Sequence, residues 1–257
     1  MVGMEPDDAT ELDGADIPGL TGAFSTVAVA GATGFVGRAL ARRLSDDHQV
    51  IGLGRGDPAA RAQASPPGIT WRRCDLFSLL DAERALAGAE VAVYLVHSML
   101  PSSRLTQGHF QDLDLICADN FARAAARQGV RRIVYTSSVA TLGLCQGTEP
   151  ANEDTPVKES DIISPYKQSK FAAEALVKRM VQEQGLPAVI VHPSTPIGPR
   201  DVKPTPTGKI VVEAAKGRMP AFVNPGLNIV HVDDVAEGHL LALDKGTGEV
   251  LHQSSLP

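Results

Sequence analysis

The fold of this chain is decided by the stretch Val27-Ala-Val-Ala-Gly31-Ala-Thr-Gly34-Phe-Val-Gly37. Its apolar first part is typical of a buried strand, and the apolar periodicity that begins at Phe35 predicts a helix. The first glycine permits a tight turn, the second lets the backbone approach a phosphate, and the third lets helix and strand pack closely. Free N–H groups at the helix N-terminus attract an anion. We therefore predict a turn that binds the pyrophosphate of a dinucleotide, made by Gly31, Thr33, Gly34, Phe35, Val36 and Gly37.

Strand and helix patterns alternate along the rest of the chain. Strands that alternate with helices form a parallel sheet covered by helices on both faces. The predicted fold class is therefore α/β, a doubly wound Rossmann sheet that occupies residues 25–192. We expect strands at residues 26–30, 49–53, 69–73, 91–96, 133–137 and 188–192, and the clearest helices at 35–44, 108–127 and 166–184.

Charge is distributed unevenly. Residues 1–24 hold six acidic residues and no basic one, and we interpret them as a disordered acidic tail. The rest of the chain, with 24 acidic and 24 basic residues, is neutral and shows no basic stripe, so we expect no nucleic-acid partner. No apolar run approaches the roughly 18 residues that cross a bilayer, and we predict a cytoplasmic protein without membrane insertion.

Cysteine and histidine patterns give no sign of a metal. Cys74, Cys117 and Cys145 lie far apart without a C-x-x-C spacing, which favours reduced thiols. His231 is followed by Asp233 and Asp234 at a strand-to-helix junction, where an aspartate is typical of a helix N-cap. We therefore predict no metal site.

A second constellation carries the chemistry. Tyr166 and Lys170 are four residues apart at the start of a predicted helix and share one face, and Ser138 follows a predicted strand. A tyrosine pKa of about 10 is too high for efficient proton exchange at neutral pH, and the charges of a lysine and a cofactor lower it. We predict that Ser138 binds the substrate oxygen, that Tyr166 exchanges its proton, and that Lys170 also holds the nicotinamide ribose.

The choice of cofactor is set where the second strand ends. An acidic residue there binds the ribose of NAD, whereas an arginine accepts the extra phosphate of NADP. Arg55 occupies that place and Arg38 follows the last motif glycine, so we favour NADP(H) over NAD(H). Pro193 and Ser194, where the sixth strand runs into a proline-rich loop, are expected to lie against the nicotinamide.

The glycine turn resembles that of the extended and atypical short-chain dehydrogenases/reductases. The stretches Tyr135-Thr-Ser-Ser-Val-Ala-Thr-Leu-Gly143 and Pro193-Ser-Thr-Pro-Ile-Gly-Pro-Arg-Asp201 make residues 133–248 similar to hopanoid-associated sugar epimerases, relatives of dihydroflavonol reductases. Residues 25–132, with Val93-Tyr-Leu-Val-His-Ser-Met99, instead resemble atypical NmrA-like NAD(P)H-binding proteins, which typically lack the Tyr/Lys pair. This pattern indicates a natural mosaic or an engineered chimera.

Further expectations follow from the resemblance. Asp75 and Leu76 look like the family's Asp-Leu pair that contacts the adenine. An asparagine often completes the family's site. Asn120 lies on the corresponding helix, but Asp114 is the other candidate for the relevant turn. The epimerase-like family continues past the strand at 249–252, so residues 193–257 are interpreted as an incomplete substrate lobe. Apolar surface at 211–215 and 240–243 would then be uncovered, which allows a homodimer.

Three functions remain open. The first is an NADP(H)-dependent oxidoreductase acting on a small alcohol or ketone. The second is a nucleotide-sugar epimerase or dehydratase that uses the same Ser138, Tyr166 and Lys170. The third is a non-catalytic NADP(H)-sensing or scaffold protein.

Overall fold

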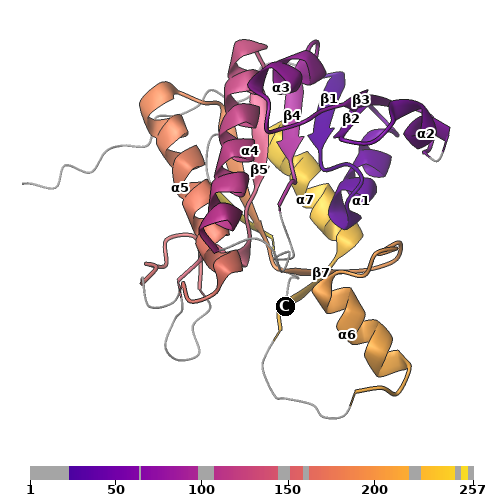
Figure 1. Ribbon diagram of the computed structural model, residues 1–257, viewed down its shortest axis with the longest axis vertical. Helices are drawn as coiled ribbons and strands as arrows, with labels where there is room; N and C mark the ends of the chain where they lie inside the picture. Colours follow the sequence, from indigo (N-terminus) through magenta and orange to yellow (C-terminus); the bar gives the residue numbers. More distant parts are fainter. Residues whose placement is uncertain are drawn as a thin grey trace, which may run out of the picture.

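The computed structural model describes residues 23–63, 65–97, 107–143, 151–158, 162–219, 227–246 and 250–253, of which 107–113 and 250–253 are described by backbone alone. A parallel sheet forms its centre (Figure 1). All six strands predicted for the Rossmann domain belong to this sheet, which confirms the doubly wound fold. The strands are β1 (Thr26–Ala30), β2 (Gln49–Gly54), β3 (Ile69–Arg73), β4 (Val91–Tyr94), β5 (Arg132–Thr136), β6 (Ala188–Pro193) and β9 (Val250–Gln253), and their order is β3-β2-β1-β4-β5-β6-β9.

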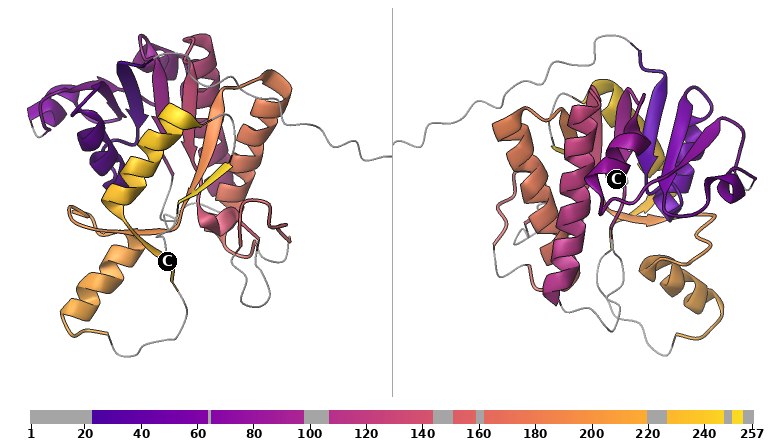
Figure 2. Two further views of the ribbon diagram at one scale, coloured as in Figure 1. Left: turned by 180° about the vertical axis from the view of Figure 1, so that it is seen from behind. Right: turned by 45° about the horizontal axis from the view of Figure 1, so that its top comes forward.

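Helices cover both faces, and the two views of Figure 2 show the layers from behind and from above. One core cluster joins the sheet to α3, α4 and α5, and the other joins it to α1 and α7. The helices are α1 (Phe35–Leu44), α2 (Pro58–Gln63), α3 (Leu79–Leu86), α4 (Gln107–Arg127), α5 (Pro165–Gln184), α6 (Pro206–Ala215) and α7 (Val232–Lys245), with the short 3-10 turn η1 (Val139–Thr141).

Alternation along the strands explains the two cores. In β1, Ala28 and Ala30 face one cluster, whereas Val27 and Val29 face the other, and all four side chains are buried. Successive side chains of a strand point to opposite faces, so a continuous apolar run suits a strand covered on both sides. The run that identified the first strand therefore also places it in the middle of the sheet.

Phe24 corrects the predicted boundary of the acidic tail. Its ring is buried and stacks on His48, with ring centroids 4.7 Å apart. An aromatic side chain with an apolar surface to cover is part of the folded body, even though the charge pattern assigned it to the tail. Residues 1–22 lie outside the described residues.

A small second sheet supports the region that follows β6. In it, β7 (Thr195–Ile197) pairs with β8 (Ile229–His231), and α6 lies beside this pair, below the main sheet in Figure 1. In α6 the side chains of Ile210 and Val211 are exposed, as expected for an uncovered surface. Near the end of α7, however, Leu243 is fully buried, because that helix packs on the sheet. The predicted exposure of residues 240–243 is therefore wrong in part.

Candidate active site

The glycine turn has the geometry that its residues predict. Gly31 adopts a φ of 88°, a left-handed conformation that favours glycine. A Cβ added at Gly37 would lie 2.1 Å from the carbonyl oxygen of Gly31, so the third glycine permits the close approach of helix and turn. Gly34 is the N-cap of α1 and offers no side-chain hydrogen bond, which leaves the first backbone N–H groups of the helix available to a ligand.

The other predicted residues of the turn contribute mainly backbone. Phe35 and Val36 begin α1, and their side chains pack against the core between that helix and the sheet. Thr33 instead lines a cavity of about 280 Å³ at the carboxyl ends of the strands. Such a place, outside the strand ends of an open parallel sheet, is where ligands of this fold bind.

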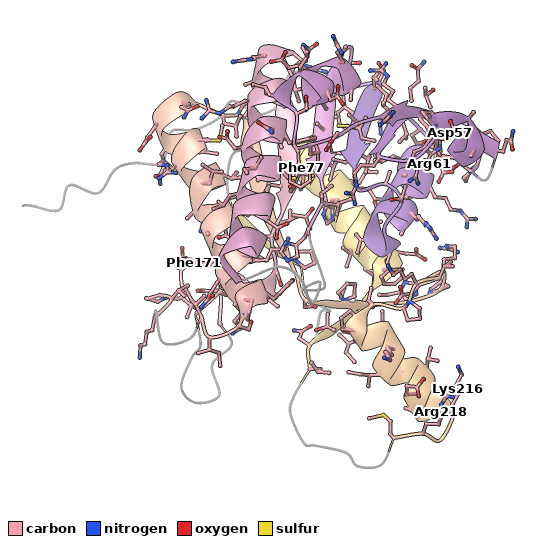
Figure 3. The ribbon with its side chains drawn as sticks, in the orientation of Figure 1. Asp57, Arg61, Phe77, Phe171, Lys216 and Arg218 are labelled. Atoms are coloured by element: carbon pink, nitrogen blue, oxygen red, sulfur yellow. The ribbon has the colours of Figure 1, made fainter. Side chains whose placement is uncertain are left out.

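Several predicted cofactor residues meet at this cavity. Its lining includes Gly31, Thr33, Gly34, Arg55, Asp75 and Leu76, and also Phe77, which Figure 3 shows near the middle of the sheet. Asp75 does not cap α3, since Ser78 does so by accepting a hydrogen bond from the backbone N–H of Asp81. The Asp75 carboxylate accepts one from the N–H of Phe77.

A second cavity, of about 400 Å³, shares Thr33 with the first and is rich in arginine. Arg38, Arg42, Arg61 and Arg200 line it, and its described lining contains no carboxylate. The Arg61 guanidinium lies over Trp71, 5.5 Å from the ring centroid, and its Cζ is 3.6 Å from the position of a Cβ added at Gly54, where β2 ends. Arg61 belongs to α2, and Figure 3 shows its place there. Arg38 was predicted from the sequence as a phosphate contact, whereas the place of Arg61 and Arg200 beside it was not, because they come from distant segments.

Helix α5 brings together the predicted acid–base residues. Ser164 caps its N-terminus, Tyr166 lies in the first turn, and Lys170 follows one turn later. The buried Lys170 ammonium donates a hydrogen bond of 3.0 Å to the carbonyl oxygen of Thr136, the last residue of β5. Ser138, two residues further along the chain, caps η1 and shares a hydrogen bond with Tyr166.

Burial dominates the protonation of this pair. Desolvation raises the pKa of Tyr166, which a hydrogen bond from Ser138 lowers in part and the charge of Asp114 raises further. Burial lowers the pKa of Lys170 to about 8, against the opposing charges of Asp114 and Glu174. The protein alone thus keeps Tyr166 a phenol, and the predicted lowering of its pKa by the charges of Lys170 and a cofactor stays a prediction.

Asp114 occupies the place for which two residues were considered. Its carboxylate accepts a hydrogen bond of 2.6 Å from Ser169, and it lies 2.9 Å from Nδ1 of His97. Asn120 lies further along α4 and donates to the carbonyl oxygen of Leu76, at 2.8 Å. The residue beside the Tyr/Lys pair is therefore an aspartate, and the asparagine holds the segment of Leu76, which lines the cavity.

A buried cluster that the sequence did not reveal surrounds Glu174, one helical turn beyond Lys170. Its carboxylate accepts hydrogen bonds from Ser137 and from Thr141, the latter at 2.7 Å, and lies 2.9 Å from Nε2 of His192. Lys178 forms an ion pair with the other oxygen at 2.7 Å. Because these partners come from the end of β5, η1 and β6, Glu174 fixes the segment that carries Ser138.

These contacts predict the effect of Glu174→Gln on stability. Hydrogen bonds from His192, Lys178 and Ser137 hold the pKa of the Glu174 carboxyl well below its ordinary value, although burial opposes them. A carboxyl whose pKa is lowered by folding stabilises the folded state at any pH above its pKa in the unfolded chain, about 4.3. This stabilisation is lost as the pH falls toward the pKa of the folded state. We expect the variant to lose about 2 kcal/mol of unfolding free energy at pH 7.

Urea unfolding at several pH values checks this prediction. The difference between the two proteins should shrink as pH falls below 5, because the wild-type carboxylate then loses its advantage. A difference that stays constant between pH 7 and pH 3 would contradict the role given to the ionised carboxylate.

The remaining predicted residues lie at the end of β6 and at α7. Pro193 ends β6, and the buried Ser194 Oγ has no hydrogen-bond partner among the described residues. The N-cap of α7 is His231, whose ring accepts a hydrogen bond from the N–H of Asp233, so the predicted aspartate cap is wrong. Both aspartates lie in the first turn, where the helix dipole favours them.

The described residues include neither a candidate metal-binding cluster nor a candidate membrane-spanning helix. No cluster of three or more His, Cys, Asp or Glu side chains there has a geometry that fits a metal ion. No described helix has the length and apolar character that a membrane crossing needs.

Comparisons with known proteins give one coherent result. The model of the NAD dependent epimerase/dehydratase family matches residues 27–252. The curated protein named "Putative dihydroflavonol 4-reductase", from Synechocystis sp., is 37% identical over 85% of this chain and 63% of its own length. Sterol demethylase protein B of Methylococcus capsulatus is 31% identical over 86% of this chain and 66% of its own length. The chain therefore spans about two thirds of each of these relatives.

Solved structures show the same likeness. The crystal structure of gox2253 matches with a TM-score of 0.83 and 42% identity, and the match covers 90% of this chain and 70% of that one. The UDP-glucose 4-epimerase of Thermus thermophilus, in complex with NAD, matches with a TM-score of 0.72 and 25% identity over 89% of this chain and 77% of its own. One family model covers both halves of the chain, so the separate resemblances of the halves, and the mosaic that they indicate, stay predictions.

Proposed function

We propose that this chain, which belongs to the NAD dependent epimerase/dehydratase family, is an NADP(H)-dependent oxidoreductase that interconverts a small carbonyl compound and its alcohol. One observation carries the proposal. Ser138 and Tyr166 share a hydrogen bond, and Lys170 lies one helical turn beyond the tyrosine. His97 contacts the Tyr166 ring, Asp114 lies 2.9 Å from Nδ1 of His97, and both residues also line the cavity that begins at the glycine turn.

The residues present fit a dinucleotide. The close approach at Gly37 and the uncapped start of α1 make a turn that a pyrophosphate can occupy. Asp75 and Leu76 would hold the adenine end, and Lys170 the nicotinamide ribose. The unpartnered Oγ of Ser194, next to Pro193 at the end of β6, suits a residue that hydrogen-bonds a bound molecule.

The proposed chemistry assigns one task to each side chain. The bound dinucleotide supplies or takes up the hydride. In the direction of reduction, Tyr166 donates its phenolic proton to the substrate oxygen, and Ser138 donates a hydrogen bond that holds this oxygen in place. The Lys170 charge then stabilises the phenolate left behind. In the reverse direction the same groups accept the proton of an alcohol.

A preference for NADP(H) is supported by the arginine-rich second cavity. Arg55 lines the first cavity, and Arg38 and Arg61 line the second, which adjoins it at Thr33. A phosphate needs several charge-assisted hydrogen bonds, and guanidinium groups give them in pairs. The 2'-phosphate of NADP(H) would occupy the place between these arginines.

The cofactor preference leads to a direct prediction. We expect the protein to bind NADPH more tightly than NADH, and Arg55→Asp to weaken NADPH binding by about 2 kcal/mol, roughly thirtyfold, with little effect on NADH. Titration by fluorescence quenching measures both affinities. Arg73→Asp is the matched control, because the exposed Arg73 lies in neither cavity. Equal affinities for the two cofactors in the unmodified protein would contradict the preference.

A second candidate function is nucleotide-sugar epimerisation or dehydration. It is favoured by the family description and by the likeness to the NAD complex of UDP-glucose 4-epimerase. The same Ser138, Tyr166 and Lys170 would serve, but the reaction begins by removing a substrate proton and needs a cofactor that stays bound. Retention of the cofactor through purification would favour this candidate.

The proposal is tested by following NADPH absorbance with a panel of ketones, aldehydes and nucleotide sugars. We expect consumption of NADPH with at least one carbonyl compound and none without substrate. Conversion of a nucleotide sugar without net consumption of NADPH would support the second candidate. Tight binding without turnover of any panel member would favour the non-catalytic sensor instead. The predicted homodimer can be measured by light scattering.

A further inference from the structure

Asp114 and His97 form a buried pair against the proposed proton donor. The two side chains are 6% and 7% exposed, and Nδ1 of His97 lies 2.9 Å from the Asp114 carboxylate. The imidazole meets the Tyr166 ring edge-on, with centroids 5.0 Å apart and an interplanar angle of 82°. His97 follows β4 and contacts the tyrosine, and Asp114 comes from α4 and holds the imidazole from its other side.

The contacts of the pair suit an ionised carboxylate and a neutral imidazole. Ser169 donates to the same Asp114 oxygen that faces His97. Burial lowers the pKa of His97, the hydrogen bond that its ring donates to the Asp114 carboxylate opposes this, and the charge of Lys170 lowers the pKa again. A neutral ring that donates from Nδ1 leaves the full negative charge on Asp114.

We propose that the Asp114–His97 pair positions a fixed negative charge that keeps Tyr166 a proton-donating phenol and Lys170 a cation, so that the site favours carbonyl reduction. This inference rests on the proposed function and extends it to the direction of the reaction. A like charge disfavours the phenolate, whereas an opposite charge favours the ammonium form. An epimerase or dehydratase would need Tyr166 as a phenolate, because its first step uses a base to remove a substrate proton.

Titratable and charged groups from several elements surround Tyr166 and Lys170, and Asp114 is the charge that acts on the tyrosine most directly. Tyr166 is faced by Asp114 from α4, His97 from the end of β4, and Ser138 and Tyr135 from the segment around β5. Lys170 lies on α5, the same helix as Tyr166, and is faced by Asp114, Glu174 and the Thr136 carbonyl. Among these neighbours, Ser138 opposes the effect on Tyr166 by its hydrogen bond.

The chain allows this proton equilibrium to be measured without a substrate. It has only three tyrosines, and burial raises the pKa of both Tyr94 and Tyr135 far above that of an exposed phenol. The first ionisation step in a titration of absorbance at 295 nm is therefore expected to belong to Tyr166. Tyr166→Phe identifies it, because the variant lacks that step.

The decisive variant is Asp114→Asn, which keeps the shape of the side chain and removes its charge. We expect the Tyr166 step to move to lower pH by about one unit, a tenfold rise in phenolate at a given pH. Asp119→Asn is the matched control on the same helix, since Asp119 pairs with Arg123 at the surface, and it should leave the step in place. Circular dichroism over the same pH range verifies that both variants stay folded.

Two results would overturn the inference. One is a Tyr166 step that stays in place or moves to higher pH in Asp114→Asn. The other is a Tyr166 step at or below pH 10, the pKa of an exposed phenol, in the unmodified protein. Comparison with Tyr166→Phe identifies that step. Neither measurement depends on turnover. A shift as expected in a protein that reduces no carbonyl would therefore count against the proposed function and not against the charge pair.

Discussion

Tyr166→Phe is expected to lower kcat by about a thousandfold and to leave the affinity for NADPH nearly unchanged. The change removes only the hydroxyl that exchanges a proton with the substrate, and a positioned acid or base contributes on the order of 10²–10⁴ to a rate. Because the aromatic ring stays, its contact with His97 and the packing of α5 are kept. Steady-state kinetics with any substrate found in the panel, together with cofactor titration, separates these two effects.

The chain offers a matched control for this variant. Tyr94 is also a buried tyrosine, but its hydroxyl has no hydrogen-bond partner among the described residues. Tyr94→Phe removes the same atom from the core and should leave kcat unchanged. If Tyr166→Phe turned over substrate at the original rate, the role of Tyr166 as proton donor would be wrong.

Gly37→Ala is expected to give the largest loss among backbone changes, about 3 kcal/mol of unfolding free energy together with most of the NADPH affinity. The added methyl group would lie 2.1 Å from the Gly31 oxygen and 2.9 Å from the Cα of Ala32, so the turn itself must move. No flexible side chain is available to give way. Thermal unfolding and fluorescence titration measure the two losses.

Gly217→Ala serves as the control for this change. Gly217 has a φ of 65°, but a Cβ added there meets nothing within 4 Å, so only the left-handed backbone is penalised. We expect a loss of about 1 kcal/mol and no change in NADPH affinity. Wild-type stability and affinity in Gly37→Ala would show that the close packing of the turn is not needed.

The order of strands and helices was predictable because each element carries its own local pattern. The run around Val27 and the glycine spacing identify β1 and the turn from residues that are neighbours in the chain. The strand β7 was missed, since Pro196 lacks a backbone N–H and proline argues against a strand. The proline is tolerated because β7 pairs with β8 on one side only and, among the described residues, leaves its other edge unpaired.

The candidate site was predictable only where its spacing is local. Tyr166 and Lys170 lie one helical turn apart, whereas the partners of Glu174 are brought together by β5, η1 and β6. A glutamate on a helix usually indicates a solvated face, and nothing in its neighbours along the chain reveals burial. Likewise, Arg61 and Arg200 share a cavity although the sequence separates them widely.

Helix α5 carries Tyr166, Lys170 and Glu174 at intervals of four residues, along about 12 Å of one rigid rod. Their mutual distances are thus inherited with the helix and do not depend on the loops around it. Mutations in the described segment after β6 can therefore change its surface while the spacing of these three side chains stays intact. Such a division lets descendants of one ancestral chain diverge in what they recognise before they diverge in chemistry.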